Sequence, residues 1–386
     1  MALHITPSFE ALEKLALTRD ADLVRRRLLD PRLNRGRGAQ SNVSGRFERE
    51  TREAVDDGWE QPESELEPLK PFETVEHIER ARSIITRNDS PDIGFDRSIN
   101  AYRGCEHGCA YCFARPTHAY LGHSAGIDFE RDIYVKVNAA ELLRRELADR
   151  RYRPRPLAMG TNTDPYQPAE RKHRLTRQIL EVLLETRHPV TITTKSALVV
   201  RDLDLLQPLA ELGLVRVGLS ITSMDRKLSR RLEPRAAAPE KRLEALRLLS
   251  EAGVPTTVMV APVIPALNDM ELERIIDAAA AQGARQAHMI LLRLPGEVRD
   301  IFREWLLRYY PDRVRHVMGL VRDARGGKDY DASWGKRMTG EGPYAVLLQQ
   351  RLEKARERYG LTGSLPALRT DLFAPPRAED RQLSLF

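Results

Sequence analysis

Cysteine is scarce in this sequence: its 386 residues contain three cysteines, at positions 105, 109 and 112. Three cysteines scattered at random over such a chain would seldom fall within one stretch of eight residues. An odd, clustered set does not indicate a disulfide framework. The three thiols instead predict a metal or iron–sulfur site.

Long apolar runs are also missing, since no uninterrupted stretch is long enough to span a bilayer. The first seven residues, MALHITP, lack the basic start and apolar stretch of a secretory signal. Hydrophobic residues nevertheless make up 41% of the chain and charged residues 31%, a composition that can bury a core. We therefore expect a folded cytoplasmic protein with no membrane association.

Lysine is rare among the basic residues, because only 10 of the 62 are Lys and the net charge is +6. Two basic clusters, at 171–174 and 226–235, begin just after expected strand ends. They are candidates for the entrance of a phosphate-bearing substrate. Solvated Arg-rich helix faces are the simpler explanation of both clusters, and a nucleic-acid partner stays open.

The pattern of residues divides the chain into three parts. Residues 1–95 include a basic, Gly-containing stretch at 31–39 and an acidic one at 50–67, and they predict a partly disordered N-terminal arm. A short helix is expected over 75–86. Residues 96–297 alternate apolar runs with amphipathic stretches. The expected strands are 98–103, 157–160, 190–194, 215–221, 256–264 and 286–292.

Helical patterns, such as 176–185 and 241–252, separate these strands. Six strand–helix repeats predict an α/β fold with a parallel sheet. A partial (β/α)6 barrel of the TIM type fits best, because candidate functional residues recur after several strands. Residues 298–386 predict a helical C-terminal extension. Within it, the Gly-rich segment 325–342 is a candidate lid or a plain connector.

The cysteines lie in the sequence YRGCEHGCAYCF, residues 102–113, directly after the first expected barrel strand. Their spacing is C-x3-C-x2-C, and three thiolates on one tight loop can bind three irons of a cubane cluster. No fourth cysteine exists, so the fourth iron needs another ligand, as an open catalytic site does. A zinc site completed by His107 or His118 is the simpler alternative.

This motif, with an aromatic residue before its third cysteine, resembles the signature of the radical S-adenosylmethionine (SAM) superfamily. The resemblance implies a [4Fe–4S] cluster on Cys105, Cys109 and Cys112, whose fourth iron binds SAM. It also implies reductive cleavage of SAM to a 5′-deoxyadenosyl radical, which abstracts hydrogen from a substrate. The barrel expected above is the fold of that superfamily.

The flanking sequences NDSPDIGF (88–95) and ARPTH (114–118) resemble the spore photoproduct lyase-like branch, often labelled "DNA repair photolyase". Ala101 replaces the Pro that commonly follows Asn100 in that branch. Spore photoproduct lyase itself also uses a further cysteine as hydrogen-atom donor. All three cysteines here are assigned to the cluster, so the resemblance does not carry the thymine-dimer reaction with it.

The resemblance further implies a set of cofactor-binding residues at the strand ends. Thr163 and Asp164 replace the usual Gly-Gly-Glu that meets the SAM ammonium group, Lys195 faces the carboxylate, and Ser220 lies near the ribose. Ile264 lies against the adenine, and Tyr111 precedes the third cysteine. Ordinary strand-end packing and turn hydrogen bonds are the alternative explanation for each of them.

The catalytic residues are not determined by sequence. Tyr111 and Tyr166 are weak candidates for relaying a hydrogen atom, and His288 in the sixth strand is a weak candidate for a substrate contact. We expect a radical SAM enzyme with an unidentified substrate and an external one-electron donor of the flavodoxin or ferredoxin type. The alternative is a cluster-bearing, nucleic-acid-binding or repair-associated protein without turnover.

Overall fold

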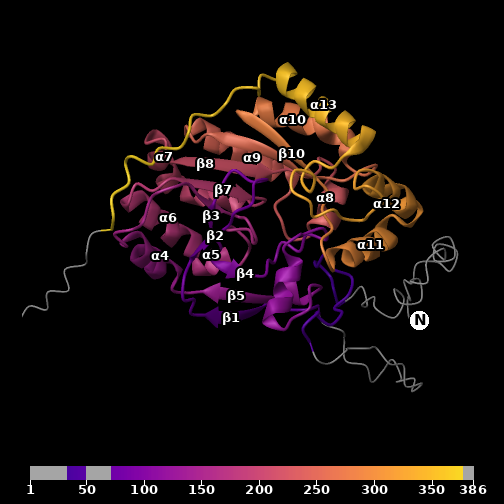
Figure 1. Cartoon of the computed structure of the whole chain (residues 1–386), viewed down its shortest axis with the longest axis horizontal. Helices are drawn as coiled ribbons and strands as arrows, with labels where there is room; N and C mark the ends of the chain where they lie inside the picture. The colour runs from indigo at the N-terminus through magenta and orange to yellow at the C-terminus, as the bar shows by residue number, and fades with distance from the viewer. Residues whose placement is uncertain (1–32, 49–70, 377–386) are drawn as a thin grey trace, which may run out of the picture.

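The computed structural model describes residues 33–48 and 71–376, and its centre is a seven-stranded sheet (Figure 1). The strand order is β10-β9-β8-β7-β6-β3-β2. The six strands from β3 to β10 pair in parallel, and only β2 at the edge is antiparallel. This is the partial six-stranded barrel that the sequence predicts.

The six parallel strands lie within three residues of their expected positions at either end, apart from the first. Their bounds are Arg97–Ile99 (β3), Leu157–Met159 (β6), Val190–Thr194 (β7), Val215–Ser220 (β8), Thr256–Val263 (β9) and Gln286–Leu291 (β10). Edge strand β2 is Ile85–Arg87. Short apolar runs of this length, bounded by turns, form buried parallel strands because helices cover them.

Helices cover one face of this sheet. They are α4 (Ala139–Leu147), α6 (Leu175–Glu185), α7 (Leu203–Glu211), α9 (Pro239–Glu251), α10 (Leu272–Ala281) and α13 (Gly342–Arg358). Each buries an apolar stripe in the main core, as Leu246 and Leu249 of α9 do. Figure 1 shows α13 beside α10 and β10, at the edge of the barrel.

A second, three-stranded sheet stands apart from the barrel. Its strands are β1 (Val75–Glu79), β5 (Asp132–Lys136) and β4 (Tyr102–Arg103), in the order β1-β5-β4. Two expectations are corrected here. The helix expected over 75–86 is replaced by β1 and β2, since 75–79 pair in register with 132–136. The first strand, expected over 98–103, divides at Asn100 and its end pairs with β5.

The C-terminal part adds α11 (Val298–Tyr309) and α12 (Val314–Asp323), which pack on the cysteine loop in a second core that includes Phe302 and Trp305. The Gly-rich segment 325–342 lies against β10, where Leu291 N–H donates to Met338 O over 2.9 Å. Farther on, Arg369 N–H donates to Gly213 O over 3.1 Å. Residues 361–376 therefore run past the strand starts.

The described part of the expected N-terminal arm packs on the folded body. Residues 33–48 lie on the cysteine loop, with Asn34, Arg37, Gln40 and Ser41 buried. The stretch 49–70, which contains the whole acidic segment, lies outside the described residues. Within the described ranges, no helix is both long enough and apolar enough to cross a membrane.

Candidate cluster and cofactor site

Two glycines shape the cysteine loop. Gly104 and Gly108 have φ of +78° and +65°, a conformation that other residues rarely adopt. A Cβ atom at Gly108 would lie 2.6 Å from Oε2 of Glu130, and one at Gly104 would lie 2.9 Å from Phe129 O. Cys105 N–H also donates to Phe129 O over 2.9 Å. The loop is thus pressed closely onto residues 129–132.

The three thiols are largely enclosed by protein. Cys105 and Cys109 are buried and Cys112 is partly exposed. Burial, and then the charge of Asp164, raises the pKa of Cys105 well above its usual value. Burial, followed by the charge of Glu233, likewise raises the pKa of Cys109. Such thiols ionise when a metal binds them, and nearby cations must then offset the negative charge.

The outer side of the loop is closed by residues 34–41. Gly38 rests directly on the loop, since a Cβ atom added there would lie 1.7 Å from Gly108 O. The fully buried Glu130 accepts hydrogen bonds from Gly38 N–H (2.8 Å) and Ala39 N–H (2.7 Å). It also pairs with the buried Arg115 at 2.5 Å, and Arg115 donates to Cys109 O over 2.8 Å. One carboxylate therefore fastens both segments together.

The inner side of the loop carries a second buried network. The Tyr111 hydroxyl donates to Oε1 of Glu233, and Thr222 donates to the same oxygen over 2.5 Å. The buried Arg242 pairs with Oε2 of Glu233 and donates to Ser220 O over 2.8 Å. Burial would raise the pKa of Glu233, but Arg242 and then Lys195 hold it below its usual value.

The loop after β6 meets the cysteine loop, as the sequence predicts. Asp164 lies 3.3 Å from Nδ1 of His107 and accepts from Thr194 Oγ1 (2.6 Å) and Lys195 N–H (2.7 Å). Burial would raise its pKa, yet His107 and these hydrogen bonds lower it to about 2. Thr163 is buried and donates to Tyr102 O over 3.2 Å. Asp164 thus joins three segments of the site.

The other expected cofactor residues lie around the same loop. The ammonium of Lys195 lies 5.9 Å from the centre of the Tyr111 ring. Ile264 is fully buried in the same apolar cluster as Cys109 and Tyr111. Ser220 is buried at the end of β8, beside Met259 of β9. The structure therefore brings Tyr111, Lys195 and Ile264 together, with Ser220 linked to them through Arg242.

The two remaining catalytic candidates lie elsewhere. Tyr166 is buried in the main core, where burial and the charges of Asp202 and Glu170 raise its pKa well above the usual value. His288 is accessible on β10 and is paired in register with Met259. Partial desolvation, and then the charge of Arg356, lowers its pKa. His288 shares the interior face of the sheet, whereas Tyr166 points into the helix layer.

Several site residues carry no recognisable sequence signal. Asn100 holds the loop after β6 by accepting from Asn162 N–H over 3.0 Å. Gln167 bridges to the cysteine loop through Glu106 N–H and Gly104 O. Their only signal is that each follows a strand. Glu130, Glu233 and Arg242 lie within ordinary helical or loop sequences and show their role only through burial.

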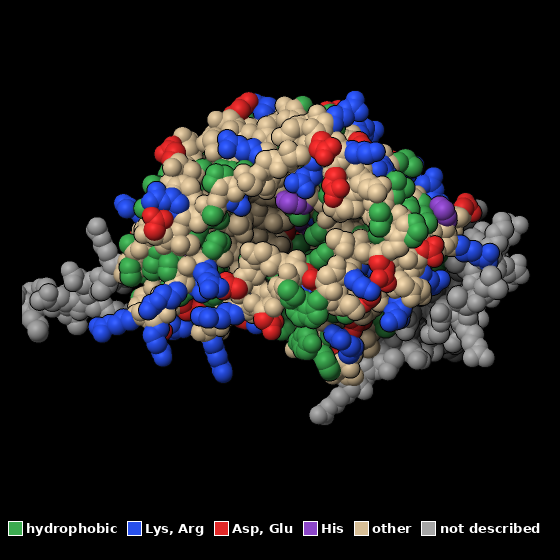
Figure 2. All heavy atoms as spheres, turned by 45° about the horizontal axis from the view of Figure 1, so that its top comes forward, with side chains coloured by type: hydrophobic (Ala, Val, Ile, Leu, Met, Phe, Trp, Pro, Cys, Tyr) green, Lys and Arg blue, Asp and Glu red, His purple; other side chains and the backbone are tan. Residues whose placement is uncertain are grey.

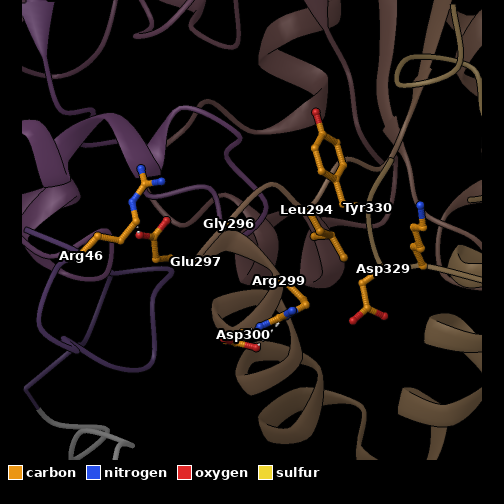
Figure 3. Close-up of a pocket in the computed structure, with 9 residues that line it drawn as sticks. Arg46, Leu294, Gly296, Glu297, Arg299, Asp300, Asp329 and Tyr330 are labelled. Carbon is orange, nitrogen blue, oxygen red and sulfur yellow. Dashed lines mark hydrogen bonds and ion pairs between the residues drawn. The ribbon is translucent and has the colours of Figure 1, made fainter. Parts of the chain in front are cut away.

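The site opens between the cysteine loop, β10 and the Gly-rich segment. Arg293 follows β10 and lies 4.8 Å from the Phe113 ring centre, and its NH2 lies 3.4 Å from the Tyr330 hydroxyl. A cavity of about 450 Å³ adjoins this opening without reaching the cysteines. Figure 3 shows Arg46 paired with Glu297 on one side and Tyr330 on the other. Figure 2 shows the hollowed face of the molecule.

These residues fit an iron–sulfur cluster better than a zinc ion. In residues 33–48 and 71–376, no three His, Cys, Asp or Glu side chains are placed to hold a single metal ion. Each histidine of the zinc alternative uses one ring nitrogen in a polar contact, Nδ1 of His107 with Asp164 and Nε2 of His118 with Asp132 O, and neither completes a set of three ligands among the described residues. A cubane instead needs each thiolate to bind a different iron. Arg115 and Lys195 supply the nearby positive charge.

Sequence comparison supports this interpretation. A sequence model of the radical SAM superfamily matches residues 99–279. The uncharacterized protein Rv2578c of Mycobacterium tuberculosis is 40% identical over 230 residues, which are 59% of this chain and 68% of the relative. The uncharacterized protein MJ0683 of Methanocaldococcus jannaschii is 32% identical over 173 residues, covering 45% of this chain and 62% of the relative.

Structure comparison shows the same fold. A mutant of spore photoproduct lyase is similar with a TM-score of 0.50 and 17% identity, over 74% of this chain and 80% of that one. The lyase complexed with dinucleoside spore photoproduct is similar with a TM-score of 0.50 and 16% identity, over 74% of this chain and 79% of that one. The chain therefore belongs to the radical SAM superfamily, whose enzymes use a [4Fe–4S] cluster and SAM.

Proposed function

We propose that Cys105, Cys109 and Cys112 hold a [4Fe–4S] cluster and that SAM binds on the inner side of their loop. The observation that carries this proposal is the asymmetry of the loop. Its outer side is closed by residues 34–41, whereas its inner side faces Tyr111, Lys195 and the barrel strand ends. When bound, the cluster and SAM supply a 5′-deoxyadenosyl radical that abstracts hydrogen from the substrate.

The strand-end residues then bind and orient SAM. Lys195 is the proposed partner of the SAM carboxylate, and Asp164 supports it by accepting the Lys195 N–H. Both carboxylate oxygens of Asp164 already have partners, so we assign Asp164 a positioning role and leave the ammonium to Thr163 and the carbonyls of its loop. Ser220 serves the ribose, and the buried Ile264 gives the adenine an apolar surface.

The rim of the opening favours nucleic acid as the substrate class. Phe47, Phe113, Tyr120 and Trp334 are 58%, 44%, 71% and 53% exposed. Each has an arginine guanidinium over its ring: Arg46 serves Phe47 and Tyr120, Arg293 serves Phe113 and Arg337 serves Trp334. Exposed aromatic rings beside arginine suit stacked bases and phosphates. A dinucleoside photoproduct is bound in one structure of the similar lyase.

The reaction needs an electron from outside the chain, and we propose a carrier of the flavodoxin or ferredoxin type. All three cysteines are assigned to the cluster, so the described chain offers no fourth thiol as a hydrogen donor. We propose the cytoplasm as its location, because cluster-binding thiols need a reducing compartment.

Product formation tests the proposal. Anaerobically reconstituted protein with SAM and dithionite should release 5′-deoxyadenosine, and Cys109→Ala should release none. Lys195→Met should raise the KM for SAM about tenfold or more, since a charge-assisted hydrogen bond is lost. Wild-type protein that carries a full cluster and yields no 5′-deoxyadenosine would overturn the enzymatic proposal.

The exposed aromatic–arginine pairs also support the second candidate, a cluster-bearing nucleic-acid-binding protein without turnover. It predicts salt-dependent binding of a single-stranded oligonucleotide and no SAM cleavage. Measuring both properties on one preparation separates the candidates. Oligonucleotide binding together with 5′-deoxyadenosine formation supports the enzyme, and binding alone supports the second candidate.

A further inference from the structure

The short helix α8 (Arg226–Leu232) packs directly on the cysteine loop. Its inner residues Leu228 and Leu232 share an apolar cluster with Cys109 and Tyr111. Leu232 O accepts a hydrogen bond from Ala110 N–H over 3.0 Å, between the second and third cysteines. Helix α8 therefore links the backbone between these two cysteines to an exposed helix face.

The opposite face of α8 is basic and exposed. Arg230 lies four residues after Arg226 and three after Lys227, so it shares a side of the helix with each of them, and all three are exposed. Arg226 lies 3.7 Å from Glu240, whereas Lys227 and Arg230 form no ion pair with any described carboxylate. The stretch 225–235 holds five basic residues against Asp225 and Glu233, and Glu233 is buried.

The basic surface continues past the end of the helix. Arg235 is exposed and pairs with Glu106 at 2.8 Å, and its backbone N–H donates to His107 O over 3.3 Å. His107 lies between the first and second cysteines. Helix α8, through Leu232, and Arg235 just after it therefore contact the cysteine loop at two separate points.

Apart from the substrate entrance that the sequence offered for 226–235, no role given above uses this surface. The proposed SAM residues follow other strands or lie at strand ends, and the cavity beside the opening takes its lining from residues 46, 294–300 and 328–330. Each exposed aromatic ring of the rim is paired with Arg46, Arg293 or Arg337. A basic patch that contacts the cluster loop but not the substrate opening suits electron entry.

We propose that Lys227, Arg230 and Arg235 form the docking surface for an acidic one-electron carrier of the flavodoxin or ferredoxin type. This inference rests on the proposed function. In the step, the reduced carrier loses one electron and the oxidised cluster gains it, with no bond broken and no proton transferred. Complementary charge steers such encounters, and salt screens them.

The test compares two charge-reversed variants in the full-length holoprotein. Lys227→Glu/Arg230→Glu alters the proposed surface. Arg150→Glu/Arg151→Glu makes the same change in charge on exposed residues just before β6, at the other end of the strands. Purified flavodoxin is the probe. Its oxidised form is used for binding by calorimetry, and its photoreduced form for the rate of cluster reduction by stopped-flow absorbance.

The α8 variant should weaken flavodoxin binding and slow flavodoxin-driven reduction by roughly tenfold or more at low salt. The control variant should match wild type in both measurements. Reduction by dithionite, and 5′-deoxyadenosine formation with it, should be unchanged in both variants, because a small reductant needs no docking surface.

Equal flavodoxin binding and equal reduction rates in the α8 variant and wild type would overturn the proposal. So would a loss of oligonucleotide binding in the α8 variant with flavodoxin binding intact, since the surface would then serve nucleic acid. Failure of the proposed function looks different, because dithionite would then also give no 5′-deoxyadenosine in wild type.

Discussion

Two fully buried Glu–Arg pairs contact the cysteine loop from opposite sides, and they have different partners. Glu130, with Arg115, accepts from the backbone N–H groups of Gly38 and Ala39. Glu233, with Arg242, accepts from the hydroxyls of Tyr111 and Thr222 and lies close to Lys195. The first pair fastens a chain segment, and the second sets the charge around the proposed SAM site.

The Glu130–Arg115 pair holds the cysteine loop against residues 33–48, whereas the Glu233–Arg242 pair sets the charge on its inner side. The Glu130 carboxylate accepts from two backbone N–H groups of residues 38–39 and from Arg115, which also binds Cys109 O. The main-chain carbonyl of Glu130 accepts from Arg37 of the same segment over 2.6 Å. Glu233 and Lys195 instead place opposite charges beside Cys109. The charge of Glu233 raises the pKa of the Cys109 thiol, and the charge of Lys195 lowers it. Changes around Glu130 should therefore release residues 33–48, and changes around Glu233 should alter the inner side while the segment stays bound.

The largest effect is expected for Glu130→Gln. Arg115 would lose its counter-charge in a fully buried position, which should lower the free energy of unfolding by about 3–5 kcal/mol. Urea unfolding measures this change, and trypsin cleavage at Arg35 or Arg37 reports release of the segment. Glu233→Gln is the matched variant and should leave the segment protected. Equal protection of the segment in Glu130→Gln and wild type would remove the distinction between the two pairs.

Gly38→Ala should have the next largest effect. The added Cβ would meet Gly108 O at 1.7 Å, and we expect a cost of about 2–3 kcal/mol with displacement of the segment. The cluster absorbance should then bleach faster in air, while anaerobic 5′-deoxyadenosine formation is retained. Gly36→Ala is the control, because nothing lies within 4 Å of its Cβ and only its φ of +75° is unfavourable. Unchanged air sensitivity would contradict a sealing role.

Tyr111→Phe tests the inner side. It removes the hydroxyl that bonds to Glu233, which should cost about 2 kcal/mol because the acceptor is charged. Thermal unfolding measures the loss, and trypsin should cleave residues 33–48 no faster than in wild type. Faster cleavage of the segment would show that the two sides are coupled rather than independent.

The smallest expected effect is a pH dependence from His118, which stacks edge-on against Phe129 beside the outer pair. Burial, and then His123, lowers its pKa to about 4. An unfolded chain therefore takes up the proton first, so stability is complete above about pH 6.5 and falls as the pH drops toward 4. Urea unfolding gives the free energy of unfolding at each pH from 7 to 5. In His118→Gln this free energy should fall less steeply with decreasing pH than in wild type, by up to about 1.4 kcal/mol per pH unit.

His188 is the matched control for this measurement, since burial lowers its pKa to about 4 as well. It lies at the start of β7 beside Tyr152 and Phe373, away from the cysteine loop. His188→Gln should reduce the change of the free energy of unfolding with pH by a similar amount, without exposing residues 33–48 to trypsin. An unchanged slope in His118→Gln would contradict the assignment of that imidazole as neutral in the folded protein.

The parallel strands could be predicted because local signals define them. Apolar runs such as 190–194 lie between turns, and their neighbours carry helical stripes. The small sheet could not be predicted, since β1 is paired with β5, more than 50 residues away, and VEHIE has no clear local preference. The break at Asn100 depends on the hydrogen bonds that its side chain makes with the loop after β6.

The site was predictable to the same extent. The cysteines lie within eight residues of one another, Lys195 directly follows β7 and Asp164 lies in the loop after β6, so topology brings them to the same end of the sheet. Glu130, Glu233 and Arg242 became visible only through tertiary contacts. No motif marks Gly38 as a contact of Gly108, because that contact depends on the fold of two distant segments.

The central claim is that three cysteines hold a four-iron cluster whose fourth iron is open to SAM. Mössbauer spectroscopy of protein reconstituted anaerobically with ⁵⁷Fe tests it most directly, with and without SAM. The account predicts that the signal of one iron in four changes when SAM is added and that the other three stay the same. A spectrum unchanged by SAM, or a protein that takes up zinc and no iron under these conditions, would contradict it.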